Sequence, residues 1–252
     1  MDKVLSRNRW VVLSALAAVV ALAWVYLACI VVARPAMDMD AIAMAAMPPP
    51  VWDVRYFAAT LAMWMVMMVG MMLPSAAPTL LLFDALEMQR GAPRHHATAW
   101  FGAGYVLAWG AFSVLAATAQ WALSAAKLLS AAMIAKPVFG GVLLVLAGVY
   151  QFTPWKTACL RQCRSPAEFL ARHYRPGPLR PLSLGLRHGL YCIGCCWALM
   201  VLLFAFGVMN LVWVAVLAVF VLAEKVTPAG ALIGRIGAVA MISAGAMLMA
   251  LG

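Results

Sequence analysis

Long, nearly uninterrupted runs of apolar residues constrain this chain more than any other feature. The first extends from Trp10 to Val32, and comparable runs recur up to the C-terminal end. About 20 apolar residues in a helix cross the hydrocarbon core of a bilayer. Because lipid offers the backbone no hydrogen-bond partners, such segments must be helices or strands of a closed barrel, and barrel strands alternate apolar and polar residues. The unbroken runs therefore predict an all-α, polytopic transmembrane helical bundle.

The composition supports the same conclusion. Hydrophobic residues make up 67% of the 252 residues and charged residues only 10%, and the mean hydropathy is +0.97. A soluble domain has about one quarter charged residues. A water-soluble fold of this length could not bury so much apolar surface, so we expect the bilayer to be the solvent.

We predict one transmembrane domain, residues 1–252, with seven spans. Their approximate bounds are 10–33, 57–80, 97–122, 134–155, 186–206, 209–224 and 230–251. The segment Leu190–Ala223 is too long for one span and requires a hairpin near Gly207 and Asn210; without that turn the number is six. The first apolar run is longer than a signal-peptide core and no small-residue cleavage site follows it, which predicts a retained first helix.

The distribution of positive charge orients these spans. Of the 18 Lys and Arg residues, only Arg34, Arg55, Lys127 and Lys136 fall in segments that face outward when the N-terminus is cytoplasmic. This bias follows the positive-inside rule. It predicts a bacterial inner-membrane protein with its N-terminus inside and its C-terminus outside. The basic residues are spread over several loops, which argues against nucleic-acid binding.

Methionine is unusually frequent, with 18 residues in the chain. One group precedes the second span, in a segment that also contains Asp and Pro: Met37, Met39, Met44 and Met47. A second group lies within that span, where a period of 3.6 residues places its members on adjoining stripes: Met63, Met67 and Met71 on one, and Met65, Met68 and Met72 on the other. Thioether sulfur suits Cu(I), but methionine also fills space in apolar cores. For the methionines of the span, both interpretations stay open. The first group is interpreted as an outer site that captures the metal ion.

The cysteines fall into ligand-like groups at the predicted inner face. Cys159 and Cys163 are spaced i, i+4, and Cys192, Cys195 and Cys196 are spaced i, i+3, i+4. His188 lies one turn before Cys192, on the same face if the segment is helical. Cys29 stands alone in the first span and is interpreted as inert packing. A thiolate metal site is the favoured hypothesis.

Other interpretations of these cysteines remain open. Simple packing of small apolar side chains is one, and a dithiol redox pair at the C-x-x-C of Cys192 and Cys195 is another. Structural disulfides are disfavoured because the inner face meets the reducing cytosol. The spacing matches no fixed zinc-finger pattern, so it does not identify the metal.

Few other residues indicate chemistry. Adjacent Glu224 and Lys225 at the inner end of a span are favoured as interfacial anchors, and the alternative is an ion path that includes Asn210 and Glu224. No nucleophile–base constellation, Walker motif or dinucleotide fingerprint is found. An enzyme is therefore the less favoured class, and an ATP-driven pump within one chain is excluded.

Several motifs together resemble a known family. They comprise Met63–Met65 with Met71–Ser75, Tyr150–Lys156 with Cys159, Cys163 and Pro166, Gly189 with Cys192, Cys195, Cys196 and Trp197, and Gly207–Leu211 with Glu224 and Lys225. From about Ala58 onward the chain resembles an uncharacterised bacterial family of predicted metal-binding integral membrane proteins. The resemblance implies that the cysteines, Asn210, Glu224 and Lys225 belong to family motifs, and it implies metal binding.

The function that we predict is binding of a soft transition metal, most simply Cu(I) with zinc as the alternative cofactor, for transport or handover across the inner membrane. Outer methionines would capture the ion, the stripe of Met63, Met67, Met68, Met71 and Met72 would conduct it, and the inner thiolates would receive it. A metallochaperone or assembly factor for a membrane copper enzyme is the alternative, and a membrane thiol oxidoreductase is the third. Expected partners are the lipid bilayer, the metal ion, and a metallochaperone or a membrane metalloenzyme.

Overall fold

The computed structural model describes residues 2–33, 52–90, 94–130, 134–177, 179–208 and 210–251. All regular structure in this part of the chain is helical, apart from one isolated bridge between Leu129 and Ala135. The nine described helices are α1 (Asp2–Ala33), α3 (Val54–Gln89), α4 (Arg94–Ala125), α5 (Pro137–Gln151), α6 (Pro154–Arg164), α7 (Pro166–His173), α8 (Arg180–Phe206), α9 (Leu211–Val226) and α10 (Gly230–Leu251). The prediction of an all-α fold is confirmed.

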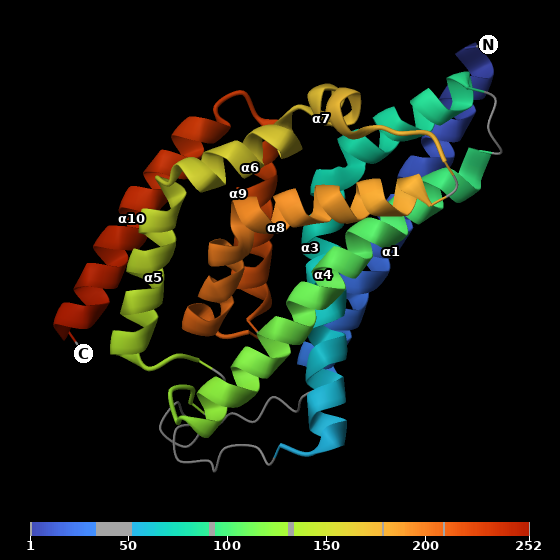
Figure 1. Cartoon of the computed structure of the whole chain (residues 1–252). Coiled ribbons are helices and arrows are strands. Elements are labelled where there is room, and N and C mark those ends of the chain that lie inside the picture. Colours follow the sequence, from blue (N-terminus) through green and yellow to red (C-terminus); the bar gives the residue numbers. More distant parts are fainter. Residues whose placement is uncertain are drawn as a thin grey trace.

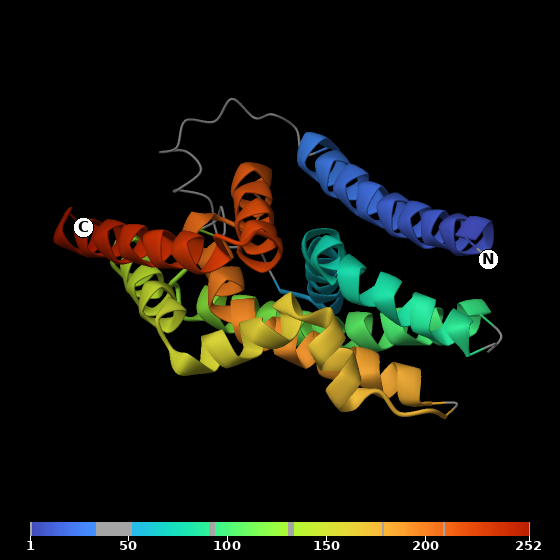
Figure 2. The same ribbon diagram turned by 90° about the horizontal axis from the view of Figure 1, so that it is seen from above.

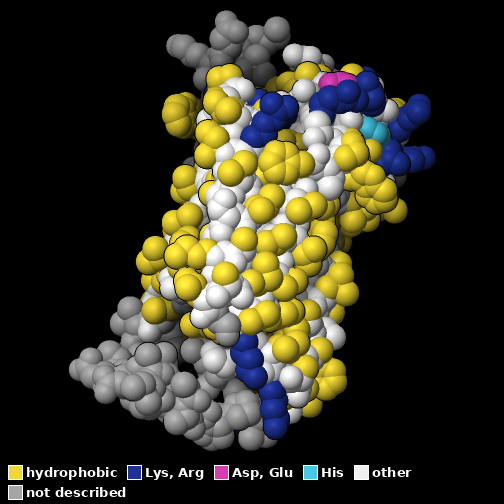
Figure 3. Space-filling model, turned by 90° about the vertical axis from the view of Figure 1, so that its left-hand side faces the viewer, with side chains coloured by type: hydrophobic (Ala, Val, Ile, Leu, Met, Phe, Trp, Pro, Cys, Tyr) yellow, Lys and Arg dark blue, Asp and Glu magenta, His cyan; other side chains and the backbone are white. Residues whose placement is uncertain are grey.

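Five of these helices are long and apolar enough to cross a membrane. These five candidate spans lie within α1, α3, α4, α8 and α10. A sixth span results if the bent pair α5 and α6 forms one crossing. This marks the chain as a multi-pass membrane protein. The predicted span 209–224 corresponds to α9, which is apolar but has only 16 residues. Figure 3 shows a mostly apolar surface along the molecule, with Lys and Arg gathered near its two ends.

The centre of the bundle is formed by α3, α4 and α8. α4 packs along α8 and against α3, α1 covers another side of α3, and α5 pairs with α10 (Figure 1). α9 lies between α10 and α1 and also contacts α3 (Figure 2). The first and last described residues lie at opposite ends of the bundle (Figure 1). The core is therefore shared by segments that are far apart in the sequence.

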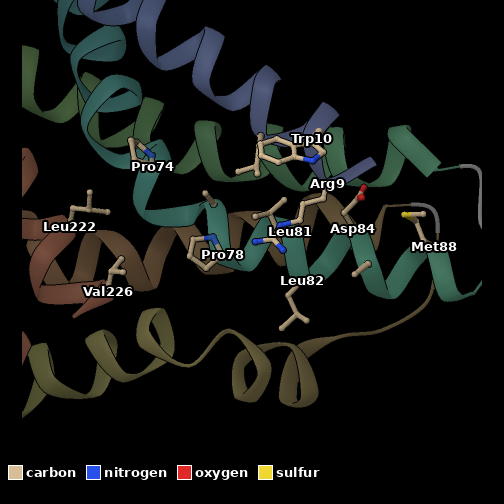
Figure 4. A pocket seen from close by; sticks show the side chains of 13 residues that line it. Arg9, Trp10, Pro74, Pro78, Leu81, Leu82, Asp84, Met88, Leu222 and Val226 are labelled. Carbon is tan, nitrogen blue, oxygen red and sulfur yellow. The ribbon is translucent and has the colours of Figure 1, made fainter. Parts of the chain in front are cut away.

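Proline residues and local caps determine where the helices bend. α3 contains Pro74 and Pro78, and the helix changes direction between them (Figure 4), because proline removes a backbone donor and its ring crowds the preceding turn. α5 and α6 meet at an angle of 66°. The Thr153 hydroxyl accepts from the Lys156 amide and Pro154 occupies the first turn, which together start α6 as a new helix.

The polar segment that follows α5 is largely helical. It contains α6 and α7. Tyr174, just after α7, donates a 2.5 Å hydrogen bond to Glu87 of α3 and lies under the Arg90 guanidinium. Partial burial and this hydrogen bond raise the pKa of Tyr174. The contact connects the segment between α7 and α8 to the C-terminal end of α3.

Candidate metal centre

Three cysteines of α8 form the middle of the candidate site. Cys192, Cys195 and Cys196 lie in an uninterrupted helix and are almost completely buried. Their spacing places them on one helical face. The thiols of Cys195 and Cys196 each donate to the Cys192 carbonyl oxygen at 3.0 Å. All the cysteines of the chain are free thiols.

The helix α6 carries the second group of cysteines to α8. Cys163 is buried, and its thiol interacts with those of Cys192 and Cys195. Cys159 is half-buried, and a Cβ placed on Gly194 would lie 2.7 Å from its sulfur. Cys159 therefore packs directly over the backbone of α8. The two groups of cysteines approach each other because the bend between α5 and α6 turns α6 across α8.

The methionines of α3 face the protein interior. Met63, Met67, Met68, Met71 and Met72 are at most 3% exposed, whereas Met65 is 39% exposed. Trp64 of the same helix is buried too, and its indole NH donates to the Gln120 side-chain oxygen at 2.7 Å. Met72 reaches the thiols, since its sulfur lies 3.9 Å from the sulfur of Cys196. One thioether is thus in direct contact with the cysteine cluster.

A buried cation contacts the same cluster. The Lys225 ammonium donates to the Cys192 sulfur at 2.9 Å and to the Ser75 hydroxyl at 3.1 Å. The Tyr105 hydroxyl lies 3.0 Å from the same sulfur and donates to the Met72 carbonyl oxygen at 3.0 Å. The favoured interpretation of Lys225 as an interfacial anchor is wrong, because its side chain is buried among α3, α4 and α8.

Glu224 is buried as well, next to a different cation. It forms an ion pair with Lys156, and both side chains are buried. Arg164 donates to the carbonyl oxygens of Glu224 and Thr227, at 3.2 and 2.9 Å. The anchor interpretation is therefore wrong for Glu224 too. Lys156, counted in the sequence among the inner-face charges, is instead one of the largest fully buried side chains.

His188 lies near the thiols but within an aromatic environment. It is 2% exposed, with ring contacts to Phe101, Tyr105 and Phe169 at centroid distances of 6.0, 5.7 and 4.9 Å. Its Nδ1 atom has no hydrogen-bond partner. This buried, unpaired nitrogen lies one turn from Cys192 and is an atom type that binds metal ions. In the described part of the chain, no contact between His188 and a thiol is observed.

The remaining predicted site residues lie apart from the cluster. Asn210 caps α9, its side-chain oxygen accepting from the amides of Val212 and Trp213 at 3.1 and 3.4 Å, so the helix cap accounts for it. Cys29 is exposed on α1. The outer methionines Met37, Met39, Met44 and Met47 lie outside the described residues.

Sequence reasoning assigned no role in the site to three contributors. Tyr105 is a single hydroxyl within an apolar span, and nothing in a one-sequence pattern distinguishes it from other isolated hydroxyls. Ser75 was included only as part of the motif Met71–Ser75, which carries the family resemblance. The position of Lys156 could have been predicted in part. Thr153 and Pro154 predict the start of a new helix, which would bring Lys156 back into the bundle.

The chemistry of the cluster is that of soft ligands. Thiolates and thioethers favour Cu(I), which is stable with two or three sulfur ligands. Within the described ranges, no group of three or more His, Cys, Asp or Glu side chains is arranged to hold a metal ion. The soft groups gathered here are the buried thiols of Cys163, Cys192, Cys195 and Cys196, with Met72 as the neighbouring thioether.

A cleft opens beside the proline-containing part of α3. It has a volume of about 1090 Å³ and lies between α1, α3 and α9 (Figure 4). Its lining is mainly apolar, with Arg9 and Asp84 as charged exceptions. Pro74 and Val226 line it and are sequence neighbours of Ser75 and Lys225. Among the described residues, no cysteine lines the cleft.

Comparison with known proteins identifies the family. No curated protein and no solved structure matches the chain. A family model does match, over residues 61–248, and its description is PpoB2, copper chaperone. The match covers α3 from Leu61, all of α4 to α9, and most of α10, and so includes every cysteine of the cluster. The chain belongs to the PpoB2 copper chaperone family.

Proposed function

We propose that this protein binds Cu(I) at the buried cysteines of α6 and α8 and hands it to a copper enzyme within or at the bacterial inner membrane. The observation that carries the proposal is the convergence of the Cys163, Cys192, Cys195 and Cys196 thiols with the Met72 thioether in a buried position. Membership of a copper chaperone family supports the choice of metal. Handover is chosen over transport because the family is one of chaperones.

The buried methionines of α3 supply a route toward the thiols from the other end of the helix. Met63, Met67 and Met71 follow one face of α3 and lead to Met72. In this proposal neutral thioethers pass Cu(I) to thiolates, which bind it more tightly. Met37, Met39, Met44 and Met47 would collect the ion before it reaches α3. If the protein transports copper, uptake into vesicles would fall when Met67 and Met71 are replaced by Leu.

The proposed topology has seven crossings with a cytoplasmic N-terminus. α9 would be a short crossing between α8 and α10, and α5 with α6 would form a bent one. An odd number of crossings agrees with the opposite positions of the first and last described residues (Figure 1). The positive-inside rule would place the basic last turn of α6, α7 and the start of α8 on the cytoplasmic side.

Metal content of the purified protein tests the proposal. Wild type and the variant Cys192→Ser/Cys195→Ser/Cys196→Ser are purified in detergent, loaded under reducing conditions with copper and zinc in competition, and analysed for bound metal. We expect stoichiometric copper in the wild type and its loss in the variant. Cys29→Ser is the matched control, because it removes an exposed thiol on α1 and should leave copper bound.

A thiol–disulfide oxidoreductase is the second candidate, and one contact favours it. A lysine beside a cysteine stabilises the reactive thiolate, and Lys225 lies 2.9 Å from Cys192. The same preparation separates the two functions. A wild type that holds no metal but forms a Cys192–Cys195 disulfide on mild oxidation would contradict copper binding and support the redox function.

A further inference from the structure

The buried charges around the thiols do not cancel. Glu224 is neutralised by Lys156. Lys225, the next residue, instead contacts Cys192 and Ser75, and within the described part of the chain it pairs with no carboxylate. One buried positive charge is therefore left facing a sulfur cluster. A buried charge without compensation is costly, so the structure requires a negative partner at the thiols.

The valence of the bound ion decides whether this requirement is met. Two thiolates carry two negative charges and Cu(I) carries one positive charge, so a bis-thiolate Cu(I) complex is an anion of charge −1. Beside the Lys225 ammonium the whole site is then neutral. A divalent ion such as Zn²⁺ on the same two thiolates is neutral by itself, and the ammonium would leave a net charge of +1 in a medium of low dielectric constant.

We propose that Lys225 is the counter-charge that makes this site select a monovalent ion over a divalent one. The inference rests on the proposed copper function and adds the basis of its selectivity. Lys225 is a positioning residue, since an ammonium group has no lone pair to donate to a metal. It acts through its charge and through its contact with Cys192.

The surrounding contacts hold the ammonium in place. Ser75 accepts from Lys225 at 3.1 Å and itself donates to the Met72 carbonyl oxygen at 2.8 Å. Tyr105 donates to that same carbonyl oxygen and lies 3.0 Å from the Cys192 sulfur. The cation is thus fixed relative to both the thiolate and the backbone of the thioether ligand. Such outer contacts commonly change metal affinity about 10–100-fold when removed.

Competition with chelators measures the selectivity directly. Cu(I) and Zn²⁺ affinities are determined separately for detergent-purified wild type and Lys225→Met, using a Cu(I)-specific and a Zn²⁺-specific chelator. We expect the Cu(I) affinity to fall about 10–100-fold in the variant, while the Zn²⁺ affinity stays the same or rises. Lys136→Met is the matched control, because it removes an exposed lysine at the start of α5 and should change neither affinity.

Further variants guard against a folding artefact. Lys225→Gln removes the charge but keeps a donor for Ser75, and it must reproduce the loss of Cu(I) preference. Lys225→Arg retains the charge and should retain the preference. An equal loss of both metals in Lys225→Gln, or an unchanged Cu(I)-to-Zn²⁺ ratio, overturns the counter-charge while leaving copper binding established. Failure of the wild type to bind Cu(I) at all overturns the proposed function itself.

Discussion

The sulfur cluster, where side chains of α3, α8 and α9 meet, and the contact between α5 and α10 belong to one bundle, but they are made of different residues. The first buries thiols, thioethers, hydroxyls and a lysine. The second is a close backbone approach: a Cβ on Gly141 would lie 2.7 Å from the Gly245 carbonyl oxygen. Small residues at such interfaces let helices associate in lipid without polar groups.

This difference in residues indicates that the two regions serve different purposes, helix association and metal binding. In lipid, helix association has no hydrophobic driving force between the helices, so tight packing or polar contacts must supply it. The α5–α10 pair uses tight packing and holds no charged residue except Arg235. The sulfur cluster keeps polar and sulfur groups that simple packing would not need. Changes in the α5–α10 contact should affect folding, and changes in the sulfur cluster should affect copper.

The largest effect on stability is expected at the buried ion pair between Lys156 of α6 and Glu224 of α9. Lys156→Met leaves Glu224 buried without its cation, which we expect to lower the free energy of unfolding by about 3–5 kcal/mol. Thermal unfolding of the detergent-solubilised protein measures this. Lys156→Met/Glu224→Met should recover much of the loss, since no charge remains unpaired. A single variant as stable as the wild type would show that the pair does not hold α6 against α9.

A smaller, purely structural effect is expected in the α5–α10 contact. A Cβ on Gly148 would lie 2.8 Å from the Ala238 carbonyl oxygen, a backbone atom that cannot rotate away. Gly148→Leu should therefore destabilise the protein by about 1–3 kcal/mol, while the folded fraction still binds copper at wild-type stoichiometry. Gly102→Leu is the control, because nothing lies within 4 Å of a Cβ there. Loss of copper in folded Gly148→Leu would contradict the separation of tasks.

The smallest effect is expected at the thioether. Met72→Leu conserves volume, so stability should change by less than about 1.5 kcal/mol, whereas the Cu(I) affinity should fall up to about tenfold as one soft ligand is lost. Chelator competition measures the affinity. Met65→Leu makes the same change at an exposed position of α3. Equal affinities in the two variants would remove Met72 from the site.

The comparison also shows what the sequence could predict. Apolar runs determined the helices because lipid leaves the backbone no other choice, and helical spacing correctly placed Cys192, Cys195 and Cys196 on one buried face. Met63, Met67 and Met71 were expected to form a stripe, and burial of that stripe was visible only in the structure. The metal-ligand role of these residues stays a prediction.

The burial of Glu224 and Lys225 could not be predicted from the sequence, for a physical reason. Adjacent Glu224 and Lys225 look alike in a sequence whether they lie at the water interface or beneath it. Their depth depends on Lys156 and Ser75, which are 68 and 150 residues distant from Glu224 and Lys225 respectively. The 66° bend that brings Lys156 and Cys163 into place depends on a two-residue break that hydropathy does not register.

In the proposed seven-crossing topology, that bend would also fix how deep the thiols lie in the bilayer. α5 has 15 residues and is therefore about 22 Å long, shorter than the roughly 30 Å thickness of the hydrocarbon core. A helix that starts at the outer boundary and ends after 22 Å stops before it reaches the inner one. The beginning of α6, and Cys159 with it, would then lie below the head groups. A copper acceptor would have to collect its ion from beneath the membrane surface, which favours an acceptor that is itself embedded in the membrane.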